Sequence, residues 1–179
     1  MLLATHGQEF STPGLCWILL SHACRMSQVL GLQTALRRSS GERDVITSEQ
    51  ELKQFTFWGL YVTDKTLSLA FGRPPFLTGP LYDALPFPHP RQLNKYRPHT
   101  RGPGVLGSEN TCSGFGSVYL LQTMKLSKIE GRILHHLHNG DRHSTSSLSN
   151  PQWFEAQMFE ASVWWKETAE VWQVLSCGD

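Results

Sequence analysis

Two charged residues, Asp64 and Lys65, lie in the middle of a nearly all-apolar segment, FWGLYVTDKTLSLAFGRPPFL, which covers residues 57–77. A charge inside such a segment is costly to bury unless it is paired or reaches water. Asp64 therefore requires a partner, and Arg73, at the end of the same segment, is the obvious candidate. The chemistry that we expect here is an ion pair at the structural centre of the fold.

Histidines are concentrated in HHLHNGDRH, residues 135–143, where His135 and His138 could share one face of a helix. A metal site usually adds a carboxylate or thiolate and groups that orient the ligands, whereas Asp141 alone lies in a glycine turn. Cationic side chains are also favoured near a helix C-terminus. We therefore expect a structural role for the histidines and no metal site.

Motifs of known enzymes give no catalytic residue. Residues 102–107, GPGVLG, match the dinucleotide pattern Gly-x-Gly-x-x-Gly, but KYRPHTR precedes them where the motif requires a buried strand. The sequence contains no Gly-x-Ser-x-Gly, His-Glu-x-x-His or phosphate-binding Gly-x-x-x-x-Gly-Lys pattern. We expect a protein that is not an enzyme and that holds no cofactor.

Composition excludes several further classes of protein. The 179 residues are 40% hydrophobic and 17% charged, which is ordinary for a globular domain. The formal net charge of +1 gives no sign of a nucleic-acid surface, and no apolar run is long enough to span a membrane. Four cysteines match no zinc-ligand spacing and are expected to be reduced thiols in an intracellular protein: Cys16, Cys24, Cys112 and Cys177.

Apolar residues at helical spacing indicate the elements that must position these residues. Four helices are expected, at 13–33, about 49–71, about 115–138 and about 152–175. Ser48 and Glu51 offer a capping box at the start of the second helix. Prolines and glycines leave no regular element between Arg73 and Ser113, and a flexible loop is expected at about 89–113. The sequence therefore predicts an all-α helical bundle with a long Pro/Gly-rich central loop.

Tryptophans divide into two groups by their position in the last expected helix. Trp165 and Trp172 belong to its apolar stripe, with Phe154, Met158, Ala161 and Leu175, so we expect them in the core. Trp153 and Trp164 lie off that stripe, and their exposure would indicate an interface.

The first two helical segments carry a family resemblance. Residues 17–33, WILLSHACRMSQVLGLQ, and residues 57–75, FWGLYVTDKTLSLAFGRPP, resemble two signatures of the fungal-specific transcription factor domain. LYDALPFP, residues 81–88, is similar to the Asp-x-x-Leu-Pro that follows them. Gln33 replaces the usual His, and Gln54 to Thr56 replace a basic pair. The matching residues are taken as structural: Arg25, Leu30, Gly31, Leu32, Phe57, Trp58, Tyr61, Asp64, Lys65, Gly72, Arg73, Pro74, Leu85 and Pro86.

The resemblance implies one incomplete regulatory domain over residues 1–179, with the specific match at 13–88. In that family, DNA is read by a separate six-cysteine zinc cluster, and nothing here resembles its Cys-x-x-Cys-x6-Cys pattern. We therefore expect a truncated regulator or gene model, with zinc bound only by the absent cluster.

The implied function is the regulation of transcription in the nucleus, with metabolic or secondary-metabolite genes as targets. The implied partners are another transcription factor subunit or the transcription machinery, with DNA reached only through the absent zinc cluster. Two alternatives stay open. One is an interaction module that modulates an intact regulator without binding DNA, and the other is a domain that senses a small-molecule effector.

Overall fold

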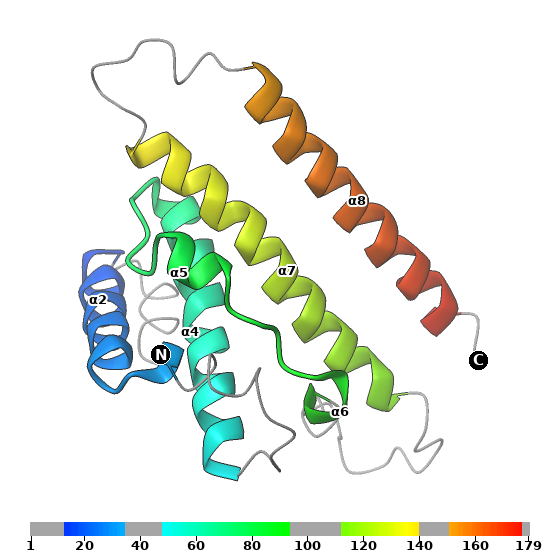
Figure 1. Cartoon of the computed structure of the whole chain (residues 1–179), viewed down its shortest axis with the longest axis horizontal. Coiled ribbons are helices and arrows are strands. Elements are labelled where there is room, and N and C mark those ends of the chain that lie inside the picture. Colours follow the sequence, from blue (N-terminus) through cyan, green and yellow to red (C-terminus); the bar gives the residue numbers. More distant parts are fainter. Residues whose placement is uncertain (1–12, 35–47, 94–111, 140–150, 177–179) are drawn as a thin grey trace. The chain divides into compact units, whose positions relative to one another are not determined.

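Helices are the regular elements of the computed structural model, which describes residues 13–34, 48–93, 112–139 and 151–176. They are α2 (Pro13–Val29), α4 (Ser48–Phe71), α5 (Pro80–Asp83), α6 (Pro90–Leu93), α7 (Cys112–Asn139) and α8 (Pro151–Ser176) (Figure 1). No strand occurs in these residues, so the all-α prediction is confirmed. The four long helices also lie where the apolar spacing predicted them.

Helix boundaries agree with the prediction to within a few residues. Helix α4 begins at Ser48 and ends at Phe71, and α7 begins at Cys112, three residues before the expected start. Helix α2 ends at Val29, earlier than predicted, because Gly31 adopts a φ of +63° and turns the chain. Glycine reaches this left-handed conformation without the penalty that a Cβ imposes.

The segment that was predicted to hold no regular element contains α5 and α6, so this prediction was wrong. Each helix has four residues and starts at a proline, which suits the first helical position. At α6, the His89 N–H donates to Gln92 Oε1 at 2.7 Å, and the Gln92 N–H donates to the His89 carbonyl at 2.8 Å. The first bond is one half of a capping box and the second is a backbone turn bond, and together they stabilise a turn too short to show periodicity. Residues 94–111 lie outside the described part.

The described residues belong to two compact units. The first contains 13–34, 48–86 and 130–139, and the second contains 87–93, 112–129 and 151–176. Helix α7 contributes to both. The single domain expected over residues 1–179 stays a prediction.

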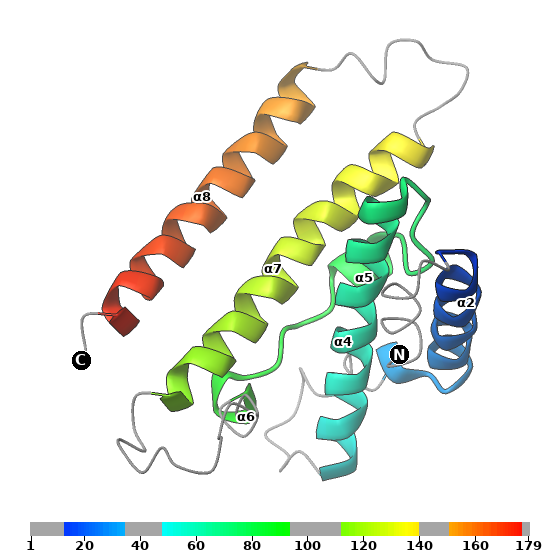
Figure 2. The same cartoon turned by 180° about the vertical axis from the view of Figure 1, so that it is seen from behind.

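In the first unit, α2 lies alongside α4, as Figures 1 and 2 show from opposite sides. Helix α2 buries a stripe of small and medium side chains, Cys16, Leu20, Cys24 and Ser27. Helix α4 is buried on most sides, as its sequence predicted. Its buried apolar side chains are Phe57, Trp58, Leu60, Tyr61 and Leu67. None of the described helices is both long and apolar enough to cross a bilayer.

In the second unit, α8 lies beside the residues of α7 that precede Glu130. The Trp164 Nε1–H donates to the Gln122 carbonyl at 3.0 Å, and Lys125 Nζ donates to Glu167 Oε2 at 2.8 Å. Lys128 Nζ lies 4.5 Å from the ring centroid of Phe87. Two polar contacts therefore fasten α8 to α7, one of them an exposed ion pair.

The predicted division of the tryptophans was wrong. Trp165, expected in the core, is 66% exposed, whereas Trp164 is half-buried against α7. Trp153 is half-buried, with its ring centroid 5.2 Å from that of Phe154. The covered side of α8 therefore includes Trp164, whose side chain points about 100° away from that of Trp165 on the predicted apolar stripe. The side chain of Trp172 lies outside the described part.

Candidate functional site

Asp64 and Lys65 form a buried ion pair inside the first unit. Asp64 is 0% exposed and Lys65 is 1% exposed, with Lys65 Nζ 2.9 Å from Asp64 Oδ2. Consecutive helical residues point about 100° apart, so they do not normally face each other. Here the long lysine side chain bends towards the carboxylate, and the two charges neutralise each other in the interior.

The pair holds the chain segment that follows α4. Asp64 Oδ1 accepts a hydrogen bond from the Phe76 N–H at 2.9 Å, and Oδ2 accepts one from the Leu77 N–H at 3.0 Å. Lys65 Nζ donates to the Leu77 carbonyl. Both backbone groups of Leu77 are therefore bonded to the buried pair. We call the four residues Asp64, Lys65, Phe76 and Leu77 the α4 clamp.

Tyr61 and Gly131 complete the surroundings of Lys65. Lys65 Nζ lies 4.5 Å from the centroid of the Tyr61 ring, within the range of a cation–π interaction. Gly131 of α7 approaches so closely that a Cβ there would lie 2.9 Å from Tyr61 Oη and 3.0 Å from Lys65 Cε. Only a glycine fits this position without displacing one of these side chains.

The end of α4 sends the chain towards the clamp. Gly72 has a φ of +60°, its N–H donates to the Leu69 carbonyl at 3.3 Å, and the Arg73 N–H donates to the Ser68 carbonyl at 2.9 Å. These two bonds with a left-handed glycine are a Schellman motif. Pro74 then prevents further helix, so the turn and the proline together fix where the chain leaves α4.

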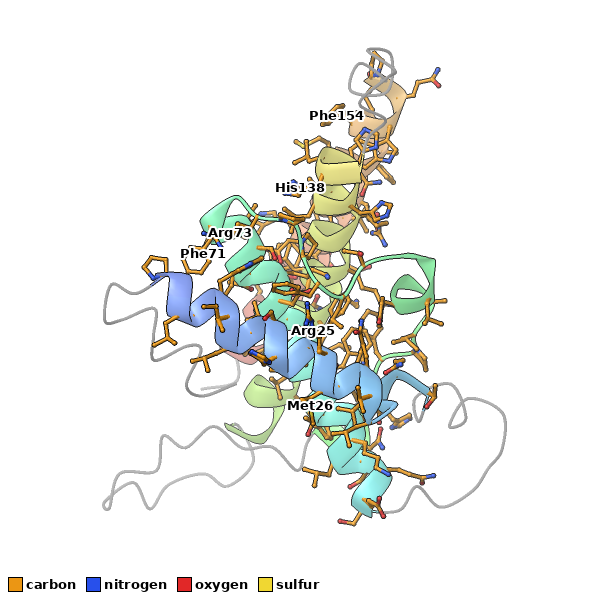
Figure 3. All side chains as sticks on the ribbon, turned by 90° about the vertical axis from the view of Figure 1, so that its left-hand side faces the viewer. Arg25, Met26, Phe71, Arg73, His138 and Phe154 are labelled. Atoms are coloured by element: carbon orange, nitrogen blue, oxygen red, sulfur yellow. The ribbon has the colours of Figure 1, made fainter. Side chains whose placement is uncertain are left out.

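The predicted pairing of Arg73 with Asp64 was wrong. Arg73 is exposed (Figure 3). Its guanidinium carbon lies 5.3 Å from the centroid of the Trp17 ring. Trp17 in turn contacts Phe71, with ring centroids 6.4 Å apart, and Phe76, at 4.6 Å. Lys65 supplies the charge that Arg73 was expected to supply, and backbone N–H groups supply the other hydrogen bonds.

Aromatic side chains line α4 one turn or more before the clamp. The Phe57 ring is stacked on Tyr82 at 6.1 Å, and Trp58 meets Tyr61 edge-on at 5.5 Å. Gln28 Nε2 donates to Tyr82 Oη at 3.0 Å, which links α2 to α5. The resemblance had not selected Tyr82 or Gln28, because their roles depend on contacts distant in sequence.

The remaining matched residues lie at different distances from the clamp. Leu85 is buried and its N–H donates to the Tyr82 carbonyl at 3.2 Å, while Pro86 is half-buried and Pro74 is exposed. At the end of α2, Leu32 is buried and Leu30 is exposed. Gly31 forms the turn after that helix. Arg25 is exposed on α2 and is not brought to the clamp (Figure 3).

Burial dominates the electrostatics around the pair. It raises the pKa of the Cys24 thiol, Asp64 raises that pKa further, and Lys65 opposes the shift. Burial also raises the pKa of the Glu130 carboxyl, again with Lys65 acting in the opposite direction. Cys24 therefore stays a protonated thiol, which is a poor nucleophile and a poor metal ligand.

The contacts of this arrangement give it a structural role, which is to hold the segment after α4. The Asp64 carboxylate already accepts three hydrogen bonds, from Lys65, Phe76 and Leu77. In the part of the chain that the structure describes, no three His, Cys, Asp or Glu side chains are grouped as metal ligands. His135 and His138 are exposed on α7, whereas His143 and residues 102–107 lie outside the described part.

Comparison with known proteins identifies a family and a relative of the chain. The family described as "Fungal specific transcription factor domain" matches residues 1–166. A protein of Claviceps purpurea (strain 20.1), named "Transcriptional regulator", is 27% identical over 171 residues, which are 96% of this chain and 24% of that protein. The chain thus spans about a quarter of the length of this curated relative. No solved structure matches the chain significantly.

Proposed function

The chain belongs to the fungal specific transcription factor domain family, and we propose that it is the helical regulatory region of a transcription regulator that acts in the nucleus. The observation that carries this proposal is the family match, which extends through residues 1–166. The name of the Claviceps relative supports the same role. The family is one of transcription regulators and not of enzymes.

DNA contact is proposed to come from protein outside these 179 residues. The sequence has four cysteines, without the spacing of a six-cysteine zinc cluster, and its formal net charge is +1. Neither feature supports the neutralisation of several phosphates that DNA binding requires. We propose that this region holds no zinc or other cofactor and controls metabolic or secondary-metabolite genes through a DNA-binding part or partner.

A reporter experiment tests the regulatory role. The chain is fused to a bacterial DNA-binding domain in a fungal strain whose reporter gene carries the matching operator. We expect the fusion to raise or lower transcription several-fold relative to the DNA-binding domain alone. Asp64→Asn, which breaks the α4 clamp, should abolish the effect, whereas Glu49→Gln, at an exposed position of α4, should preserve it. A folded, nuclear fusion that leaves transcription unchanged would contradict the proposal.

The alternative of an interaction module gains support from α2. Four of its large apolar side chains are exposed, and their spacing places them on one face of the helix: Leu15, Ile18, Met26 and Val29. Figure 3 labels Met26 on this helix. An apolar surface of this kind is typical of a protein interface. We propose that it contacts another transcription factor subunit, which would place the regulatory effect in that complex.

Co-expression with an intact zinc-cluster regulator tests this second role. The tagged chain should co-purify with the regulator, and Val29→Glu should abolish co-purification because it places a charge in the apolar face. Thr66→Glu, at an exposed polar position of α4, is the matched control and should have no effect. A parent chain that never co-purifies with such a regulator would remove this alternative.

A further inference from the structure

A second exposed apolar surface lies on α8. Phe154, Met158 and Trp165 are 39%, 70% and 66% exposed, and Ala161 lies between them in sequence. Spacings of four, three and four residues place all four on one face of a helix. Figure 3 labels Phe154 near the first turn of α8. We call these four residues the α8 seam.

The α8 seam is not the side of the helix that contacts α7. Helix α8 meets α7 through Trp164, which donates to the Gln122 carbonyl, and through Glu167, which pairs with Lys125. Met158 and Trp165 are turned away from these contacts and are mostly exposed. Exposed groups of large apolar side chains on a soluble protein usually mark an interaction surface.

The α8 seam is complementary to itself when the second helix runs in the opposite direction. Met158 lies three residues before Ala161 and Trp165 lies four after it, which corresponds to about 4.5 Å and about 6 Å along the axis. Two antiparallel copies centred on Ala161 therefore bring each Met158 beside the partner's Trp165. Sulfur–aromatic contacts of this kind are favourable, and the small Ala161 allows the helices to approach closely.

Charge selects the same antiparallel arrangement. Glu155 lies six residues before Ala161 and Lys166 lies five after it, at about 9 Å and about 7.5 Å along the axis. Eleven residues are close to three full turns, so both side chains leave α8 on the same side of the seam. Antiparallel copies place each Glu155 beside the partner's Lys166. Parallel copies would instead place the two Glu155 side chains at the same height on opposite sides of the contact, away from either Lys166.

Neither charge has another ion-pair partner in the described residues. Glu155 and Lys166 are both exposed, and no ion pair of the described part includes either of them. Both are therefore available for a second chain. An interface in which the same surface serves both partners is the usual form of a twofold homodimer.

We propose that α8 is a homodimerisation surface, in which two copies of this chain pair antiparallel through Phe154, Met158, Ala161 and Trp165. Two Glu155–Lys166 ion pairs, one at each end of the contact, fix its register. The contact involves one helix of each copy, so association is modest in strength and depends on concentration. This inference goes beyond the regulatory role and does not depend on it.

Analytical ultracentrifugation over a concentration series tests the apolar part of the proposal. The parent chain should change from the mass of one chain to that of two as its concentration rises, whereas Trp165→Glu should keep the mass of one chain. Phe159→Glu is the matched control, because Phe159 is 71% exposed on α8 but lies off the seam. It should dimerise like the parent. Equal far-UV circular dichroism and urea midpoints verify that each variant folds.

Charge reversal tests the antiparallel register. Glu155→Lys and Lys166→Glu should each weaken dimerisation, by about tenfold in the dissociation constant, because each creates two repulsive pairs. The double reversal should restore the parent value. A parent chain that stays single at every concentration overturns the proposal. A dimer that Phe159→Glu disrupts and Trp165→Glu does not, or one that the double reversal fails to restore, also overturns it.

Discussion

An Asp64→Asn substitution removes the negative charge of the α4 clamp and keeps the shape of the side chain. The Lys65 ammonium, 1% exposed, would lose the carboxylate that lies 2.9 Å from its Nζ. The asparagine NH₂ group would also point a donor at a position that now accepts hydrogen bonds from Phe76 or Leu77. Removing one partner of a buried pair typically costs about 3–5 kcal/mol.

That cost is a large fraction of the free energy of unfolding of a typical domain, which is about 5–15 kcal/mol. Urea unfolding followed by far-UV circular dichroism should therefore show a strongly lowered midpoint for Asp64→Asn. Arg73→Ala provides the contrast, because it removes only an exposed cation–π contact with Trp17, worth about 0.5–1 kcal/mol. Glu49→Gln, at the exposed end of α4, should leave the midpoint unchanged.

The ratio of the two losses decides between the observed pairing and the pairing predicted from the sequence. If Arg73 were the partner of Asp64, the two substitutions would destabilise the protein about equally. A loss below about 1 kcal/mol for Asp64→Asn would refute the reasoning, because removing the charged partner of a buried ion pair costs more than that.

Three further substitutions test the surroundings of the clamp. Gly131→Ala should destabilise the protein by about 1–3 kcal/mol in urea unfolding, because its Cβ would press on Tyr61 and Lys65, whereas Gly14→Ala, whose Cβ meets nothing within 4 Å, should not. Gly72→Ala should cost about 1–2 kcal/mol through backbone strain alone, and Gly72→Asn should cost less. Burial raises the pKa of Glu130 above its ordinary 4.5, so its ionised form destabilises the fold at neutral pH. Glu130→Gln should therefore raise the urea midpoint at pH 7, and the gain should disappear as the pH falls below 4.5. An unchanged midpoint in any of the three would contradict the corresponding contact.

The position and burial of α4 could be predicted from its sequence. Apolar residues occur almost all the way round the segment, and Gly72 with two prolines ends it. These signals are local, because they depend on helical periodicity and on backbone conformations that proline and glycine favour. The helix and the point where the chain leaves it were therefore predicted correctly.

The partner of Asp64 could not be predicted in the same way. Sequence reasoning compares side chains with side chains, and it selected Arg73 as the nearest cation at the helix end. Two of the three donors to Asp64 are backbone N–H groups of Phe76 and Leu77, which every sequence contains. Adjacent helical residues do not usually face each other, so helical spacing gave no reason to pair Asp64 with Lys65.

The exposure of the apolar stripe on α8 could not be predicted from the sequence either. Helical spacing shows which residues share a face, and Phe154, Met158 and Trp165 do share one. It does not show which face another element covers. The contacts of Trp164 and Glu167 place the covered side next to this stripe, so the stripe itself is exposed.

Amide hydrogen exchange at Leu77 is the most direct test of the central claim, which is that the buried pair holds the segment after α4. In the native parent protein, the Leu77 amide should exchange slowly, because its N–H donates to Asp64 inside the core. Asp64→Asn should remove this protection, and Arg73→Ala should retain it. A Leu77 amide that exchanges in the parent protein as fast as in an unstructured peptide would contradict the account.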